Sequence, residues 1–404
     1  MIAAIRDRFF AALHAAGLPE IPSQFAVTPF HQEIPRTVFK RIEQFIRIFD
    51  QVTTRPAWLA QVTAAAPPIA RQHRREVCFF SAWDFHLPPE HPEQWQLIEC
   101  NDNGSGFLFA ALINRLYCEH ADLPADLVRP PPYPVFADRV AAMIDHEARL
   151  FFGRRPEGLL LVVDDAASLR EGKFRRELVL LRELCSAEGW AAEIATPAEL
   201  GWSDRRLLWR GREVVFVINR STDFFWQADV FESLRAAYAH GGVYVAPNPF
   251  TYATRSDKAL AELLSQSRWD GELGILPEER SELSAHVPET HLLRPDNVDV
   301  IAHRKDDYVF KPAHGFASHG LLASSTVGRS RLHRLLKKGP PYVAQRRVPK
   351  SRLHAAGNVP VWSDLRVWAF RGECFLLSGR ASRDADTLDL APPGGWLPTY
   401  VRET

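Results

Sequence analysis

Two oxygen-bearing side chains stand two residues apart in the segment Trp95–Gly106, where an apolar run ends in Glu99 and Asn101. Side chains at i and i+2 of a β-strand point to the same face, so these two would lie side by side. Carboxylate and amide oxygens suit a hard cation such as Mg²⁺. Asp84 lies fifteen residues before Glu99, near the end of a second expected strand, and could complete the set. The pattern predicts a metal site of three residues; the alternative is a strand that runs into an Asn/Gly turn, with Glu99 solvated at its edge.

A lysine and two glycines follow the expected strand that begins at Tyr308. Lys311 ends this strand, and Pro312 turns the chain into a loop that contains Gly315 and Gly320. Backbone N–H groups of such a loop can surround phosphate oxygens, and the lysine adds a compact positive charge. The pattern indicates a phosphate-binding site, and the alternative is a surface lysine that precedes a hairpin.

Two further regions carry groups that could recognise a nucleotide or another anion. The apolar segment Tyr342–Val348 is an expected strand whose backbone could hydrogen-bond the edge of an adenine ring. Asp364 and Arg366 share one face of a later strand, and the return strand carries Arg380, a candidate clamp for an anion. The alternative is that both arginines only pair with an aspartate, either Asp364 or Asp384.

Alternating apolar runs and helical stretches begin at Gly158. The first run, Leu159–Val163, is unbroken and ends in two aspartates, which is typical of a parallel strand buried on both faces. The alternation predicts a small doubly wound α/β unit. This unit contains neither GxGxxG nor GxxxxGK, so it lacks the glycines of dinucleotide-binding and P-loop proteins. The expected strands are Leu159–Val163, Ala191–Ile194, Val214–Ile218 and Val243–Ala246, and the expected helices lie near Phe174–Leu184 and Phe231–His240.

The segment before this unit is expected to be mostly helical, with two strands inserted. An apolar stripe at helical spacing predicts one helix, and its members are Val38, Ile42, Phe45, Ile46 and Phe49. The aromatic and β-branched stretches Glu76–Asp84 and Trp95–Glu99 are the expected strands. The candidate metal ligands are therefore expected on two strands that lie close together in the sequence.

Composition limits the classes of function. The 404 residues include 49 basic and 49 acidic side chains, and 46% are hydrophobic. The chain can therefore bury a large core, and its zero formal charge argues against a general nucleic-acid or membrane-surface binder. Five scattered cysteines indicate free thiols in a reducing compartment, and charges at residues 6–8 interrupt any signal peptide. We expect a soluble, cytoplasmic protein that acts on small molecules, with no nucleic-acid and no membrane partner.

In combination the motifs resemble the circularly permuted branch of the ATP-grasp enzymes, which includes glutathionylspermidine synthase. In that branch the strand that bears the metal carboxylates, usually the last, comes first, as Leu97–Asp102 does here. The order and spacing of the motifs carry the resemblance. They are Asp84-Phe85, Leu97-Ile-Glu-Cys-Asn-Asp102, Asn248-Pro-Phe250, Ser256-Asp-Lys258, Phe310-Lys-Pro312, Ala344-Gln-Arg-Arg-Val348, Arg380 and Ala391-Pro-Pro-Gly-Gly395.

The resemblance implies an α/β (α+β) architecture of ATP-grasp type in permuted order, and an ATP-dependent carboxylate–amine ligase. Such an enzyme transfers the γ-phosphoryl group of ATP to a carboxylate, and an amine then attacks the acyl phosphate. The implied organisation is an N-terminal segment with the metal-binding strand (1–150), the central α/β unit (151–255) and a nucleotide-binding lobe (256–404). The implied sites are Asp84, Glu99 and Asn101 for Mg²⁺; Lys258, Lys311, Gly315, Gly320, Gln345, Arg346 and Val348 for ATP; and Arg380 with Lys311 for catalysis.

The chain also departs from the synthase pattern. Ala82 stands where those synthases have an arginine, two residues before Asp84, and Asn-Gly-Ser-Gly follows the Glu-x-Asn-Asp strand in place of Thr-Pro. The glycine loop also lacks an expected arginine. These differences bear on the glutathione and spermidine substrates more than on nucleotide chemistry. Two alternatives are a nucleotide-binding pseudoenzyme or assembly subunit without turnover, and a non-nucleotide α/β protein whose Glu99 and Lys311 form surface pairs.

Basic residues crowd the segment that follows the expected adenine strand. Arg346, Arg347, Lys350 and Arg352 lie within seven positions. The functional interpretation is that this flank receives an anionic carboxylate or amine substrate, such as an acidic peptide or a phosphorylated acid. The alternative is a solvated basic surface.

Overall fold

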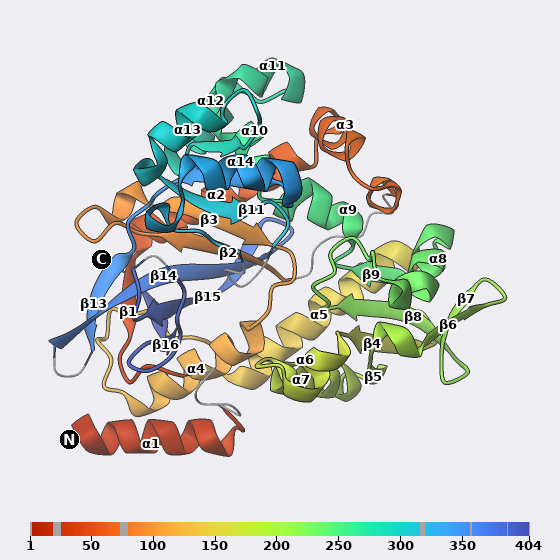
Figure 1. Cartoon of the computed structure of the whole chain (residues 1–404). Coiled ribbons are helices and arrows are strands. Elements are labelled where there is room, and N and C mark those ends of the chain that lie inside the picture. Colours follow the sequence, from red (N-terminus) through yellow and green to blue (C-terminus); the bar gives the residue numbers. More distant parts are fainter. Residues whose placement is uncertain are drawn as a thin grey trace.

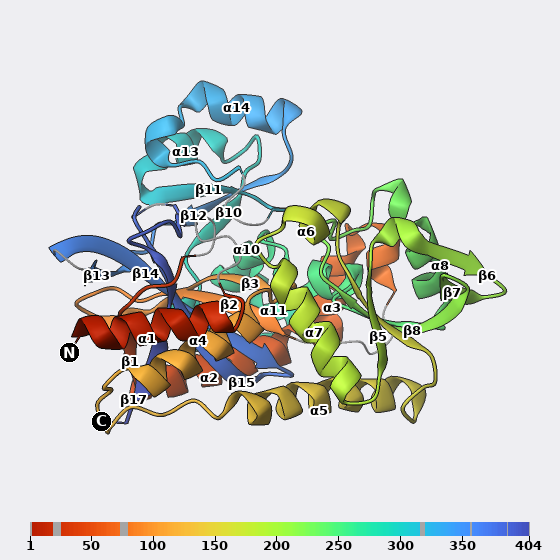
Figure 2. The ribbon, with the colours of Figure 1, turned by 90° about the horizontal axis from the view of Figure 1, so that it is seen from below.

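The computed structural model describes residues 2–18, 26–72, 80–315, 320–355, 358–385 and 387–403 of the chain. Within these residues the fold combines helices with four β-sheets. Figure 1 shows a large antiparallel sheet with an α/β unit, built from the middle of the chain, at its right. Figure 2 shows a smaller sheet above the large one, covered by helices α13 (Val298–His303) and α14 (Arg329–Lys338). The fold is thus a mixed α/β arrangement of three packed regions.

The large sheet joins strands from opposite ends of the chain. Its order is β16-β15-β14-β2-β3, with β13 paired to β14, and all neighbours are antiparallel. Trp83 and Phe85 of β2 are buried on one face, and Asp84 points to the other because successive side chains of a strand alternate. The strands are β2 (Ser81–His86), β3 (Gln96–Asn101), β13 (Ser351–Ala355), β14 (Val359–Phe370), β15 (Glu373–Ser382) and β16 (Gly395–Leu397).

Helix α2 (Arg36–Thr53) covers the apolar face of this sheet, and the whole stripe predicted from the sequence is buried there. The turn after β3 ends at Gly106, whose φ of 97° favours glycine, and helix α4 (Phe107–His120) begins at the next residue. The other elements of this part are α1 (Ile2–Ala15), α3 (Pro56–Ala64), α5 (Tyr133–Phe152), and β1 (Gln32–Pro35), which pairs in parallel with β17 (Thr399–Arg402).

The α/β unit has a parallel core in which β4 lies between β5 and β8, and β8 also pairs with β9. The prediction of Leu159–Val163 as a buried strand is confirmed at both ends by β4. A hairpin of β6 (Leu200–Ser203) and β7 (Arg206–Trp209), which the sequence did not predict, extends the sheet. The remaining elements are β5 (Ala191–Ala195), β8 (Arg212–Asn219), β9 (Tyr244–Ala246), α6 (Ala166–Glu171), α7 (Arg175–Ala187) and α8 (Glu232–His240).

The small sheet has the order β10-β12-β11, with both pairs antiparallel. A π-helical turn, Tyr252–Ser256, ends just before Lys258 on the way into this region, and such turns are frequent at functional sites. The elements are α9 (Pro249–Thr251), α10 (Leu260–Ser265), α11 (Asp270–Leu273), α12 (Pro277–His286), β10 (Thr290–Leu292), β11 (Tyr308–Pro312) and β12 (Tyr342–Arg346), besides α13 and α14.

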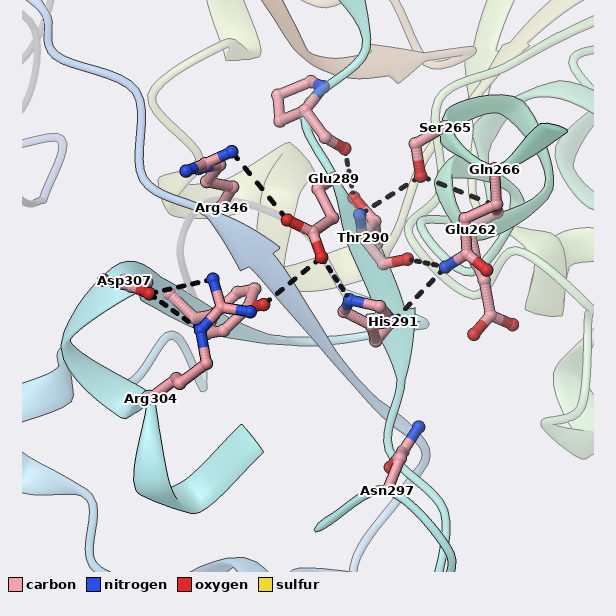
Figure 3. A network of polar contacts seen from close by, with 12 residues as sticks. Glu262, Ser265, Gln266, Glu289, Thr290, His291, Asn297, Arg304, Asp307 and Arg346 are labelled. Carbon is pink, nitrogen blue, oxygen red and sulfur yellow. Dashed lines mark hydrogen bonds and ion pairs between the residues drawn. The ribbon is translucent and has the colours of Figure 1, made fainter. Parts of the chain in front are cut away.

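A polar network fixes the outer edge of the small sheet (Figure 3). Gln266 Nε2 donates to the Thr290 carbonyl oxygen at 2.7 Å, which ties the end of α10 to β10. Glu289 Oε1 lies 2.8 Å from His291 Nε2, and Glu289 Oε2 lies 3.9 Å from Arg346 Nη1. The network therefore sets the position at which the chain leaves β12.

The expected strand Glu76–Asp84 differs from the structure at its carboxyl end, and its residues 76–79 lie outside the described residues. Strand β2 runs from Ser81 to His86, because β14 pairs with it from Ser81 to Phe85. Asp84 is therefore flanked by neighbouring strands on both sides instead of standing at a strand end. Among the described helices none has the length and apolar character needed to cross a bilayer.

Candidate active site

A cavity of about 700 Å³ opens where the large sheet, the α/β unit and the small sheet meet. The large sheet contributes Asp84 and Glu99, the α/β unit contributes Arg220, and the small sheet contributes Lys311. Among the described lining residues eleven are lysine or arginine and four are aspartate or glutamate, although the whole chain carries equal numbers of the two charges. This concentration of positive charge attracts anions, and it makes the cavity the candidate active site.

Asp84 lies in a buried cluster of charges on the large sheet. Arg366 stands opposite it across β14 and β2, and Arg366 Nε and Nη2 donate to the two carboxylate oxygens at 2.6 Å each. Arg380 Nη2 lies 2.8 Å from Asp84 Oδ2 and 2.6 Å from Asp364 Oδ2. Burial alone would raise the pKa of Asp84, but the two guanidinium groups outweigh it and hold that pKa well below its usual range. The cluster contains two aspartates and two arginines.

Both interpretations of Arg366 and Arg380, as an anion clamp and as partners of aspartates, apply in part. Arg380 pairs with Asp364, as the alternative proposed, and it also lines the cavity. Arg366 pairs with Asp84 and not with Asp364 or Asp384. Ala82 shares the face of β2 that carries Asp84, and the guanidinium groups beside this aspartate come from Arg366 on β14 and Arg380 on β15.

Glu99 and Lys258 form an ion pair at the other side of the cavity, with 3.2 Å between Glu99 Oε2 and Lys258 Nζ. Lys258 Nζ also donates to the Gly315 carbonyl oxygen at 2.6 Å. Burial alone would raise the pKa of Glu99, but the charges of Lys258 and Lys311 outweigh it and lower that pKa. Glu99 is therefore an ionised side chain paired with a lysine, at the point where β3, the edge strand of the large sheet, runs into a turn.

The three residues expected to bind Mg²⁺, Asp84, Glu99 and Asn101, differ in whether their oxygen atoms can reach an ion. No cluster of three His, Cys, Asp or Glu side chains that could hold a metal ion occurs in the described parts of the chain. Guanidinium groups bind both oxygens of Asp84, so this residue does not fit as a direct ligand in the present arrangement. Glu99 and Asn101 do share one face of β3 and line the cavity. Mg²⁺ is usually held by one or two protein oxygens together with substrate phosphates, and these two residues fit such an ion.

Lys311 is a cavity residue and not a surface lysine. Its Nζ donates to Gln345 Oε1 at 2.7 Å across the pairing of β11 with β12. Burial lowers the pKa of Lys311 to about 8, and the negative charge of Glu99 partly opposes this shift. Gln345 is thus engaged by a lysine side chain, while Lys311 and Lys258 both border the space around Glu99.

The chain segment after β12 lines the cavity through Arg347 and Val348. The N–H groups of Arg346 and Arg347 donate to carbonyl oxygens of Glu289 and Asp307. The carbonyl oxygen of Val348 lies 2.8 Å from His86 Nδ1, and this hydrogen bond connects the segment to the last residue of β2. Among the described residues no backbone hydrogen bond uses the Val348 N–H, which leaves this group for a ligand.

The two loop glycines differ in their position. Gly315 lines the cavity and accepts the hydrogen bond from Lys258. Gly320 is not among the described lining residues, and at its φ of +75° an added Cβ would stand 2.7 Å from Pro312 Cγ. Gly320 therefore serves the close approach of the loop to Pro312, whereas Gly315 borders the site.

The α/β unit contributes a second arginine site, which the sequence analysis did not single out. Arg220 follows β8, is 3% exposed, and its Nη2 donates to Glu177 Oε2 at 2.9 Å and to Ser105 Oγ at 2.7 Å. Its Nε and Nη1 are buried without a hydrogen-bond partner in the described residues. Ser105 also accepts a 3.4 Å hydrogen bond from Arg366 through its carbonyl oxygen, which connects the two arginine sites.

A positional signal could have found Arg220. Ligand sites of open α/β sheets lie beyond the carboxyl ends of the parallel strands. Arg220 comes directly after the expected strand of residues 214–218 and Asn219, and Asp164 comes directly after Leu159–Val163. Both residues line the cavity.

Comparison with known proteins supports the fold. No family model matches this chain, and no curated protein matches it in sequence. A glutathione synthetase-like effector from Globodera pallida, in its apo form, has a similar structure with a TM-score of 0.63 and 12% identity, over 99% of this chain and 98% of that chain. A Methylobacillus flagellatus protein assigned as a gamma-glutamylcysteine synthetase gives a TM-score of 0.49 at 12% identity, over 91% of this chain and 89% of that chain. The chain therefore has a fold similar to that of the glutathione synthetase-like effector.

Proposed function

We propose that this chain is an ATP-dependent carboxylate–amine ligase of the permuted ATP-grasp type, similar to glutathionylspermidine synthase. One observation carries the proposal: a single cationic cavity contains two lysines from the small sheet side, two arginines on the large sheet and a third arginine in the α/β unit. The three groups correspond to the three things such a ligase must bind, namely the nucleotide, the transferring phosphoryl group and the acid.

The nucleotide lies against the small sheet. The adenine edge meets the free Val348 N–H, and Lys258 and Lys311 contact the phosphates. When the polyphosphate of ATP binds, Lys258 leaves its ion pair with Glu99, and Lys311 leaves its hydrogen bond to Gln345. Both ammonium groups then bind phosphate oxygens. Glu99 and Asn101 would hold the Mg²⁺ that accompanies ATP, and this ion would neutralise charge on the phosphoryl oxygens.

The acid binds beside Arg220, because a buried guanidinium group with two unused N–H groups is a fitting partner for a carboxylate. An oxygen of the substrate carboxylate attacks the γ-phosphorus, ADP leaves, and an acyl phosphate forms. Arg366 and Arg380 stabilise the negative charge on the transferring phosphoryl group and on the acyl phosphate. An amine then displaces phosphate from the carbonyl carbon and gives the amide.

The test is ADP release in the presence of Mg-ATP across a small panel. The acids are glutamate, gamma-glutamylcysteine and glutathione, and the amines are glycine, cysteine and spermidine. We expect Mg-ATP to raise the melting temperature, and ADP release to require one acid and one amine together. At a concentration of 100 times the dissociation constant, ligand binding stabilises the fold by about 2.7 kcal/mol. An unchanged melting temperature at saturating Mg-ATP would remove the basis of the proposal.

A second candidate function is nucleotide binding without turnover. The observation that favours it is the occupation of both Asp84 oxygens by arginines, together with alanine at position 82. This candidate predicts the same stabilisation by Mg-ATP but no ADP release with any acid and amine of the panel.

A further inference from the structure

Asp164 differs from the other acidic residues that line the cavity. Asp84 and Asp364 are paired with arginines, and Glu99 is paired with a lysine. Among the described lining residues Asp164 is the one acid that forms no ion pair, and it is only 7% exposed. Its Oδ1 accepts a hydrogen bond from the Asp165 N–H at 2.7 Å. A carboxylate is therefore held at the cavity wall without a cation bound to it.

The strand pairing places Asp164 next to the arginine that we assign to the acid. Val163 of β4 stands opposite Asn219 of β8, and the Arg220 N–H donates to the Val163 carbonyl oxygen at 2.7 Å. Asp164 and Arg220 are the next residues of these two parallel strands. A cation site and an anion site thus lie side by side at the same sheet edge, facing one cavity.

We propose that Asp164 is a catalytic base that binds the attacking amine and removes its proton. The inference rests on the proposed ligase function. In this step the amine nitrogen forms a bond to the carbonyl carbon of the acyl phosphate. The carbon–oxygen bond to phosphorus breaks, and its electron pair leaves with inorganic phosphate. The proton moves from the nitrogen to the Asp164 carboxylate, so charge and atoms balance.

The environment of Asp164 suits this role. Burial raises the pKa of Asp164 to about 7, while the Asp165 N–H and the charge of Arg220 oppose this shift. The charged or polar groups that face Asp164 are Arg220 after β8, the Asp165 carboxylate beside it and the Ser168 hydroxyl on α6. A general base works best with a pKa near the pH of the reaction. A carboxylate of ordinary pKa would be a much weaker base.

Other carboxylates near the acid are already engaged. Glu177 accepts hydrogen bonds from the Gly106 and Leu108 N–H groups as well as from Arg220. Asp165 accepts from the Ser221 hydroxyl at 3.0 Å, and it is not among the described cavity-lining residues. Among the described lining residues Asp164, whose hydrogen bonds come from the Asp165 N–H and the Ser168 hydroxyl, is therefore the one carboxylate on this side of the cavity without an ion pair.

The experiment compares two nucleophiles in Asp164→Asn. Hydroxylamine is largely unprotonated at neutral pH and traps an acyl phosphate as a hydroxamate without help from a base. With the acid of the panel that supports ADP release, we expect the kcat/KM for the amine to fall at least about a hundredfold at pH 8. Hydroxamate formation with hydroxylamine should stay within about twofold. Glu171→Gln, which removes an exposed carboxylate on α6, should leave both rates unchanged.

A pH profile gives the second readout. In the parent protein, kcat/KM calculated on the unprotonated amine should fall about tenfold per pH unit below pH 7, since the protonated carboxyl cannot accept a proton. Asp164→Asn should lose this limb. Equal losses of amide and hydroxamate formation would show a structural role and overturn the proposal, as would a variant that ligates at the parent rate. A parent protein without ADP release on any panel member would instead overturn the ligase function itself.

Discussion

The two ends of the cavity hold their cations in different ways. At one end, which we call the lysine end, Lys258 and Lys311 are flexible side chains whose ammonium groups contact one carboxylate, one amide and one carbonyl oxygen. At the other end, Arg366 and Arg380 are forked groups in bidentate pairs with aspartates, and both side chains are 8% exposed. One set of cations can change partners, and the other is fixed before any substrate arrives.

The proposed ligase function gives a reason for this difference. A polyphosphate brings several negative charges, so lysines that release a single contact can bind it at low cost. The transferring phosphoryl group passes through a short-lived state, and groups oriented in advance stabilise it without further reorganisation. We infer that substrate binding rearranges the lysine end and leaves the arginine end as it stands.

The largest expected effect is a loss of folding stability when an arginine is removed at the arginine end. Arg366→Ala leaves the buried Asp84 carboxylate with Arg380 as its remaining cation, and breaking a buried pair in this way costs about 3–5 kcal/mol. Urea denaturation measures the change in unfolding free energy. The matched control is Arg329→Ala, whose pair with Asp299 is exposed and should leave the unfolding midpoint unchanged. Similar midpoints for the two variants would remove the distinction between the ends.

The second-largest expected effect is a loss of ADP release, with little loss of folding stability, at the lysine end. Glu99→Gln removes the carboxylate that pairs with Lys258 and is assigned to Mg²⁺, but it keeps the size of the side chain. We expect ADP release to fall at least about a hundredfold, with a change in unfolding free energy of no more than about 1 kcal/mol. Steady-state kinetics and denaturation of the same preparation check this. Parent-level ADP release would show that Glu99 does not hold the ion.

The third effect is a pH dependence that belongs to Lys311. Because its folded-state pKa is about 8, the folded protein binds fewer protons than the unfolded chain above that pH, up to the ordinary lysine pKa. The contribution of this residue to apo stability therefore rises with pH in that window. Affinity for Mg-ATP has the opposite trend, and we expect it to weaken about tenfold between pH 7 and pH 9 as the ammonium loses its proton.

Calorimetric titration with Mg-ATP at several pH values measures this trend. Lys311→Arg keeps its charge over the same range, so its affinity should not fall between pH 7 and pH 9. A parallel decline in both proteins would assign the titration to another group.

The smallest expected effect concerns the basic segment that follows β12. Arg347 and Arg352 are exposed at the cavity, whereas Lys350 is 9% exposed and donates to the Thr387 carbonyl oxygen at 2.8 Å. Reversal of Lys350 would disrupt the loop that it supports, so the informative variant is Arg347→Glu with Arg352→Glu. We expect a KM for the anionic substrate that rises severalfold at low salt and differs little at 1 M salt, where the screening length is about 3 Å. An unchanged KM would mark the segment as solvated surface.

Local patterns predicted the elements of the fold well. Leu159–Val163 and the stripe on α2 required only alternation, helical period and turn residues, because each element buries its own apolar face. The small β6–β7 hairpin escaped prediction, because Leu200–Ser203 and Arg206–Trp209 are only four residues each. The bounds of β2 depend on its pairing with β14, which begins more than 270 residues later.

The candidate site was harder to predict, because it too depends on pairing between segments that are far apart in the sequence. Glu99, Lys258 and Lys311 were singled out as candidates from short motifs, and the structure brings all three to one cavity. The partners of these residues come from other segments. The pairing of Asp84 with Arg366 spans 282 positions, and the adjacency of Asp164 and Arg220 depends on the register of β4 and β8. Sequence patterns indicate which residues can do chemistry, but long-range pairing decides which charges neutralise each other.

In the proposed ligase reaction, the γ-phosphoryl group of ATP passes to a carboxylate of the acid substrate. The most direct measurement uses the acid of the panel labelled with ¹⁸O in its carboxylate, together with Mg-ATP and the amine, and mass spectrometry of the released phosphate. An acyl phosphate intermediate places one carboxylate oxygen in each phosphate, so we expect one ¹⁸O per phosphate released during amide formation. Unlabelled phosphate would mean that water attacks ATP directly, and it would overturn the proposed transfer to the carboxylate.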